Sequence, residues 1–266
     1  MGNPKSNKNK IVAVVIVIVL LIIGGLFVFG FNALSIPFFS DSHTQILVIG
    51  QLSPGERLTL DNLSSLYTYR ERTAKDLESS SIEELDYYDI IILDQSLSEK
   101  SVSADLGAAI EKYVRQGGKL ILVLNSATKQ SLGINGLNAT DSIGWKTTMG
   151  DVSPADCVLL SGNTPSCKEG NEIAVVGRII RTQEHPIMAG VYMAPTVDQE
   201  PYSLLALPIK ASAGAKEIAY FDVENTPQRV PAILEKTSFP FGNVIYFNYD
   251  PGRTVNIFKN TLEYLK

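Results

Sequence analysis

Residues 117–130, GGKLILVLNSATKQ, contain the short strand and the turn that decide the fold. A glycine pair ends the preceding element, the apolar run 119–124 follows, and the chain then turns at Asn125 and Ser126. A run this short and apolar, bounded by turn residues, predicts a buried strand. In many α/β enzymes the nucleophile lies on the turn directly after such a strand. The stretch therefore raises the question whether Ser126 is a nucleophile.

Strand and helix patterns alternate in the residues before this stretch. The segment starting at Ser81 has the Ser-x-x-Glu form of a capping box, and apolar residues recur at helical spacing in 103–116. This alternation favours a mostly parallel sheet with helices on both faces. We expect strands at 45–50, 67–73, 88–94 and 119–124. Ser53-Pro54-Gly55-Glu56 resembles a helix entry, and we expect helices at 58–66, from 81 onward and at 103–116.

The second half of the chain has a different pattern of predicted secondary structure. Residues 131–172 are rich in glycine and asparagine and predict loops with a hairpin. Short strand-like runs separated by turn residues then predict an antiparallel extension of the sheet. The segment 256–265 has its apolar residues on one face and predicts a closing helix. The strands expected in this half are 172–182, 204–209, 217–222, 232–235 and 243–248.

An apolar segment near the N-terminus predicts a membrane anchor. Residues 11–31 carry no charge and no strongly polar side chain, and about 20 apolar residues suffice for a helix to cross a bilayer. Lys5, Lys8 and Lys10 precede the segment with no acid among them, so the positive-inside rule keeps the N-terminus in the cytosol. We predict a cytoplasmic tail at 1–10, a single transmembrane helix at 11–32, a linker at 33–44 and an extracytoplasmic domain at 45–266.

The charge of the predicted domain limits its partners. Removing the three lysines and one aspartate of residues 1–44 from the totals of 23 basic and 28 acidic residues leaves 20 and 27, a net charge of −7. Nucleic acids and anionic lipid surfaces require clustered Lys and Arg, so we expect neither as a partner of the domain. The expected partners are the lipid bilayer, through 11–32, and a membrane or surface protein.

Two cysteines and two sequons bear on the compartment. Cys157 and Cys167 flank a Gly-Asn-Thr-Pro turn, and outside the cytosol such a close pair is more often a disulfide than a metal site. Asn62 and Asn138 each begin an Asn-x-Ser/Thr triplet and are glycosylation candidates.

Four phrases together resemble the class I glutamine amidotransferase-like superfold, in particular its ThuA-like and DUF4350-like relatives. They are YDIIILD (88–94), YVRQGGKLILVLNSA (113–127), EHPIMAGV (184–191) and PAILEKTSFPFGNVIYFNYDPGRTVNIFKNTLEYL (231–265). The resemblance covers most of residues 45–266 and implies a flavodoxin-like α/β domain. Because this fold hosts both enzymes and inert modules, it does not by itself fix the chemistry.

At the turn, the resemblance implies that the amidotransferase nucleophile is lost. The enzymes carry Cys-x-Gly-x-Gln after this strand, whereas here Ser126 stands in place of the cysteine and Thr128 in place of the glycine. A glycine suits a tight turn of unusual backbone angles, and a hydroxyl is much harder to activate than a thiol.

The catalytic base is also missing from its expected place. The family carries a His-Pro-Glu phrase after a late strand, and Asp250-Pro251 aligns with that His-Pro. The predicted domain has only one histidine away from the membrane, His185, which is followed by Pro186 and Ile187 rather than by Pro and Glu. We interpret His185 as part of a structural turn, with catalysis or ligand binding as the alternative.

Polar residues at strand ends leave a second interpretation open. Asp94 ends a strand where ligands of open parallel sheets bind, and Asn125, Ser126 and Asp250 are candidates to meet it there. An acidic, hydroxyl-lined cleft would suit a sugar or a cation. In the alternative, Asp94 and Asn125 cap helices and Asp250 begins a turn. No phosphate loop, dinucleotide fingerprint or metal-ligand cluster is present in the sequence, so we expect no cofactor and no metal.

Two functions remain open from the sequence. The first is a membrane-anchored, extracytoplasmic binding or scaffold module without catalytic activity, as a subunit of a membrane complex. The second is a hydrolase or carbohydrate-binding protein that uses a cleft near Asp94, Ser126, His185 and Asp250.

Overall fold

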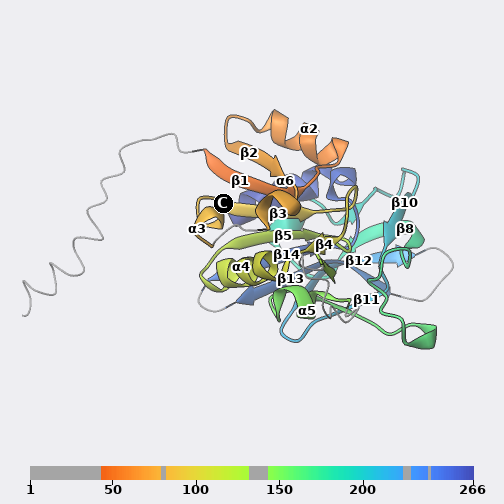
Figure 1. The fold of residues 1–266 in the computed structure, drawn as a ribbon. Coiled ribbons are helices and arrows are strands. Elements are labelled where there is room, and N and C mark those ends of the chain that lie inside the picture. The colour runs from red at the N-terminus through yellow and green to blue at the C-terminus, as the bar shows by residue number, and fades with distance from the viewer. Residues whose placement is uncertain (1–42, 79–81, 132–142, 224–228, 239–240) are drawn as a thin grey trace, which may run out of the picture. The chain divides into compact units, whose positions relative to one another are not determined.

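Apolar strands buried on both faces form the centre of a ten-stranded sheet (Figure 1). The computed structural model describes residues 43–78, 82–131, 143–223, 229–238 and 241–266. One half of the sheet is parallel and runs in the order β14-β5-β3-β1-β2. Its strands are β1 (Thr44–Gly50), β2 (Tyr67–Arg72), β3 (Ile90–Asp94), β5 (Lys119–Val123) and β14 (Gly242–Phe247).

The other half of the sheet is antiparallel and continues from β14 in the order β13-β12-β8-β10. Short connections between successive strands permit antiparallel pairing, whereas parallel neighbours need a long crossover. The sheet is therefore mixed, and the prediction of a mostly parallel sheet underestimated this half. Its strands are β8 (Ile173–Arg181), β9 (Met193–Ala194, paired with β8), β10 (Tyr202–Ala206), β12 (Lys216–Val223) and β13 (Arg229–Ser238).

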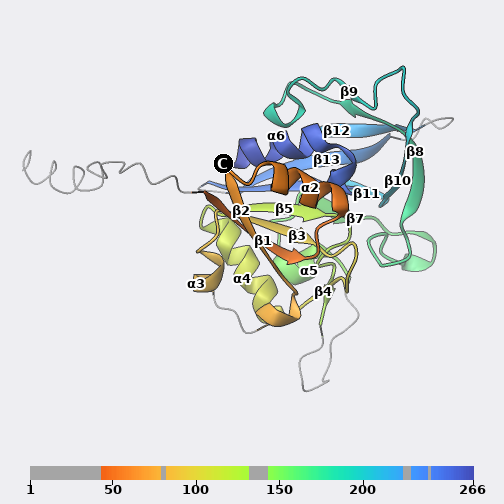
Figure 2. The same cartoon turned by 90° about the horizontal axis from the view of Figure 1, so that it is seen from above.

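Helices cover both faces of the sheet, as predicted (Figure 2). Leu60 of α2 (Pro54–Asn62) and Ile257 of α6 (Val255–Leu265) belong to the apolar core on one face. The core on the other face includes side chains from α3 (Ile82–Leu85), α4 (Ala104–Arg115) and α5 (Trp145–Met149). Alternate residues of the central strands supply the two cores, because successive side chains of a strand point to opposite faces.

Helix α2 begins at the predicted helix entry, ahead of the apolar segment 58–66. Ser53 is the N-cap, its hydroxyl accepts from the amide of Glu56, and the Glu56 carboxyl accepts from the amide of Ser53 in return. This capping box with Pro54 in the first turn sets the start. The helix ends at Asn62, a solvent-exposed residue and one of the two glycosylation candidates, while Asn138 lies outside the described residues.

The remaining elements are short. Strand β4 (Ser101–Val102) pairs with β6 (Lys129–Gln130), and β7 (Ala155–Cys157) pairs with β11 (Ile209–Ala211). Four 3-10 turns complete the described chain: η1 (Lys75–Leu77), η2 (Ser161–Asn163), η3 (Pro186–Met188) and η4 (Pro251–Arg253).

The predicted tail and transmembrane helix, 1–10 and 11–32, lie outside the described residues, as does most of the linker 33–44. The described chain starts at His43, and Thr44 already belongs to β1. Within the described ranges no helix is both long enough and apolar enough to cross a bilayer.

Candidate functional site

The turn after β5 does not have the geometry of a nucleophile elbow. A nucleophile elbow joins a strand directly to a helix through a strained residue that carries the nucleophile. Here the positive φ angles fall on Leu124 (48°) and Ala127 (53°), on either side of Ser126. The chain then enters β6 at Lys129 rather than a helix.

The polar atoms of Ser126 are all bonded within the fold. Its side chain is fully buried, and its Oγ accepts a hydrogen bond from the Gln95 amide at 2.7 Å. Its carbonyl oxygen accepts from Nε1 of Trp145 at 2.8 Å. The Ala127 amide, which would be an oxyanion-hole donor in an elbow, instead donates to Oε1 of Gln95 at 2.7 Å. The hydroxyl and the amide that acyl transfer would require are thus both hydrogen-bonded to Gln95.

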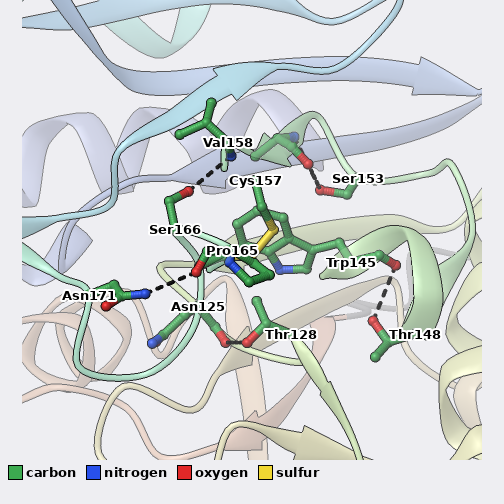
Figure 3. The surroundings of a disulfide bond; sticks show 12 residues. Asn125, Thr128, Trp145, Thr148, Ser153, Cys157, Val158, Pro165, Ser166 and Asn171 are labelled. Carbon is green, nitrogen blue, oxygen red and sulfur yellow. Dashed lines mark hydrogen bonds between the residues drawn. A yellow bond between two sulfur atoms is a disulfide. The ribbon is translucent and has the colours of Figure 1, made fainter. Parts of the chain in front are cut away.

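The disulfide hairpin lies beside this turn (Figure 3). Cys157 and Cys167 are bonded, which confirms the predicted pairing. Asn125 donates from Nδ2 to Oε1 of Glu172 at 2.6 Å, and this bond joins the turn to the chain just after the hairpin. Thr128 is buried and donates from Oγ1 to the carbonyl of Asn125 at 2.9 Å. Asn125 and Thr128 therefore stabilise the turn.

His185 packs elsewhere, against the side of the sheet that α6 covers. Its Nδ1 accepts from the Ile187 amide at 3.3 Å, its Nε2 lies 3.3 Å from Oε2 of Glu235, and its ring contacts Tyr264 edge-on. Glu235 also accepts from Asn243 at the start of β14. Since β14 and β5 are parallel, His185 lies toward the end of the sheet opposite to Ser126. Burial lowers the pKa of His185, partly offset by Glu235.

Asp94 and Asp250 gather around a third acid, Glu56. Glu56 and Asp94 are both fully buried, and neither Glu56 Oε1 nor Asp94 Oδ2 has a donor among the described residues. Burial, together with the charge of Asp94 and a hydrogen bond to it, raises the pKa of Glu56 well above its usual range. Burial also raises the pKa of Asp94, while hydrogen bonds from Glu56 and Ser96 oppose that rise. A proton on Glu56 that is donated to Asp94 satisfies both orphaned oxygens.

Hydrogen bonds to Asp250 hold the segments around the acid cluster together. Asp250 Oδ1 accepts from Ser53 Oγ at 2.7 Å and from the Gly252 amide at 2.8 Å, which joins the start of α2 to η4. A Cβ on Gly252 would lie 2.4 Å from Ser53 Oγ, so only glycine permits this approach. Within the described residues no three His, Cys, Asp or Glu side chains are arranged to hold a metal ion. Asp94 caps a local turn through the Ser96 amide at 2.8 Å, and Asp250 caps η4.

The described chain also has a surface groove that no sequence pattern indicated. Its volume is about 790 Å³, and it runs between the chain around β9 and the start of α6. None of the predicted site residues lines it. The lining residues are Gly190–Val197, Gln199, Tyr202 and Arg253–Ile257. They come from two distant parts of the sequence, and nothing in their local pattern indicates a site.

Comparison with known proteins identifies the fold and not the function. No protein-family model and no curated protein sequence matches the chain. A β-galactosidase from Rahnella sp. R3 is similar in structure, with a TM-score of 0.50 and 13% identity over 84% of this chain and 31% of that one. The N-terminal domain of mmIFT52 gives a TM-score of 0.50 and 11% identity over 83% and 96% of the two chains.

Another similar solved structure aligns over nearly all of its own length. A putative GMP synthase component from Thermoplasma acidophilum has 11% identity over 84% of this chain and 93% of that one, with a TM-score of 0.44. The chain spans about a third of the length of the β-galactosidase. At identities this low, the likenesses describe an α/β fold with a mixed sheet and nothing more.

Proposed function

We propose that this protein is a membrane-anchored binding or scaffold module whose amidotransferase-like domain lies outside the cytosol and carries no amidotransferase activity. In this proposal the flavodoxin-like domain serves as a rigid support, residues 11–32 cross the membrane, and the function is to hold a partner protein of a membrane complex at the cell surface.

One observation carries the loss of catalysis. The Ser126 hydroxyl and the Ala127 amide are both bonded to Gln95 in a fully buried turn. An activated serine needs a base within hydrogen-bond reach, whereas His185 is engaged by Glu235, Ile187 and Tyr264 toward the other end of the sheet. The alternative of a hydrolase or carbohydrate-binding cleft at Asp94, Ser126, His185 and Asp250 has less support, since His185 and Ser126 lie toward opposite ends of the sheet.

The membrane and export parts of the proposal rest on the sequence and on the disulfide. The uncharged segment 11–31 follows three lysines, and the Cys157–Cys167 bond suits an oxidising compartment. Protease treatment of intact cells tests the orientation. We expect a C-terminal tag to be digested from outside while an N-terminal tag is protected, and the reverse pattern would refute the proposed topology.

Co-purification tests the scaffold role. The full chain, tagged and extracted in mild detergent, is compared with the double variant Ser126→Ala/His185→Ala. We expect both to retain the same set of co-purifying membrane proteins, because neither residue contributes to a binding surface. Loss of the partners from a folded double variant would refute a non-catalytic role. A hydrolytic activity that the wild type has and the folded double variant lacks would refute it as well.

A further inference from the structure

Exposed apolar side chains line the rim of the surface groove beside β9. Tyr192 is 63% exposed, Val197 78% and Val255 44%, and all three line the groove. An isolated exposed apolar residue is ordinary, but a group of them around a concave surface is typical of a binding site. The two walls are firmly placed, because Asn260 of α6 donates to the carbonyls of Ile187 and Ala189 at 3.2 and 2.9 Å.

The groove carries a single charge. Arg253 is the only charged residue in its lining, its side chain is exposed, and within the described residues its guanidinium makes no ion pair. The preceding acid, Asp250, is already bonded to Ser53 and Gly252. Asp198 lies next to Val197 in sequence but is not part of the lining. The groove thus presents one available cation in a domain of net charge −7.

The groove lining also includes residues of a short edge strand. Met193 and Ala194 of β9 line the groove and pair with β8 through one edge of the strand. No second strand pairs with β9 within the described chain. Two amide side chains, Gln199 and Asn256, add donors and acceptors to the same lining. An edge strand beside apolar pockets is the arrangement by which proteins bind extended peptides.

We propose that this groove binds an extended segment of a partner protein, with a carboxylate of that segment against Arg253 and apolar side chains against Tyr192, Val197 and Val255. The inference rests on the proposed binding function and names the chemistry of the partner. Charge complementarity selects an acidic segment, since no lining carboxylate competes for Arg253. The apolar rim selects a segment that also carries aliphatic or aromatic residues.

A random 12-residue peptide display library tests the proposal, with the full chain in mild detergent as the target. We expect enriched peptides that combine an Asp, a Glu or a free C-terminus with apolar neighbours, and we expect the enrichment to disappear with Val197→Arg. The matched control is Leu97→Arg, because Leu97 is also exposed (58%) but lies outside the groove. No enrichment, or enrichment that Val197→Arg leaves unchanged, would overturn the proposal.

A double-mutant cycle with the best synthetic peptide then tests the charge pair. Both Arg253→Gln in the protein and Asp→Asn in the peptide should weaken binding about 3- to 10-fold, and the two changes together should weaken it no further than either alone. Arg70→Gln on β2 is the control for net charge. Additive effects of the two changes, or equal effects of Arg70→Gln and Arg253→Gln, would refute the assignment of Arg253.

Two further outcomes separate this inference from the proposed function. If native mass spectrometry finds a lipid bound to the unaltered chain and absent from Val197→Arg, the groove is a lipid site and the peptide proposal is wrong. If the chain co-purifies with partners that Val197→Arg still retains, the scaffold function holds and the groove is not its binding surface.

Discussion

The Ser126 hydroxyl and the backbone amide of Gln95 form a buried 2.7 Å hydrogen bond that joins the end of β5 to the end of β3. Gln95 bonds three times around this turn, since its side chain also accepts from the Ala127 amide and donates to the Ser101 carbonyl. Ser126 therefore serves as an acceptor for a backbone amide that would otherwise be unpaired.

Replacing Ser126 with alanine should weaken the fold and leave function unchanged. The change leaves the Gln95 amide buried without an acceptor, which costs about 1–3 kcal/mol. Urea unfolding followed by circular dichroism measures the loss. Ser203→Ala on the exposed face of β10 is the control, and its free energy of unfolding should change by less than about 0.5 kcal/mol. An unchanged stability for Ser126→Ala would show that the bond is not formed.

Replacing Glu56 with glutamine should flatten the pH dependence of stability. A raised folded pKa means that the folded protein holds a proton which the unfolded chain releases near pH 4.3, so wild-type stability falls as pH rises above about 4.3 toward the folded pKa. Glutamine can accept from Ser53 and donate to Asp94 without ionising. Denaturant unfolding between pH 4 and 9 should show that the free energy of unfolding of Glu56→Gln increases relative to that of the wild type as pH rises.

The control for this experiment is Glu99→Gln, a solvent-exposed residue. This change leaves the acid cluster intact and should not reproduce the gain of Glu56→Gln. A Glu56→Gln curve parallel to the wild-type curve would mean that Glu56 and Asp94 share no proton.

Replacing His185 with glutamine should remove a loss of stability in acid. Burial lowers the pKa of His185, so the unfolded chain binds a proton near pH 6.5 that the folded protein resists. Wild-type stability should therefore fall as pH drops from about 6.5 through the folded pKa, and this component should be missing from His185→Gln. Thermal melts between pH 5 and 8 give the difference curve. A difference curve of opposite sign would place a protonated imidazolium against Glu235.

Removing the disulfide should lower stability without unfolding the core. Cys157 and Cys167 are ten positions apart, and closing a loop of that length stabilises a fold by about 2–3 kcal/mol in the chain-entropy model. Cys157→Ser/Cys167→Ser should lose about this amount in urea unfolding. Reductant should lower the stability of the wild type and leave the double variant unaffected. Equal sensitivity of both proteins to reductant would contradict the assignment.

The sequence by itself determined the parallel centre of the sheet, the helices on its faces and the disulfide. Each is a local signal: short apolar runs for β1, β3 and β5, a helix entry at Ser53 where α2 begins, and a cysteine pair across one turn. The antiparallel half was underestimated because β13 extends beyond its apolar middle, 232–235, into flanking residues that carry no strand pattern of their own.

Only the tertiary structure decided the state of the candidate site. No sequence pattern marks Gln95 as part of a site. Its backbone amide donates to the Ser126 hydroxyl because β3 and β5 are neighbours in the sheet. In the sequence, Glu56 is only part of a predicted helix entry. Its burial against Asp94 follows from the packing of α2 on η4. The groove joins β9 to the start of α6, residues some sixty positions apart. Burial, partner and charge at these places are properties of packing between distant segments, which no local pattern specifies.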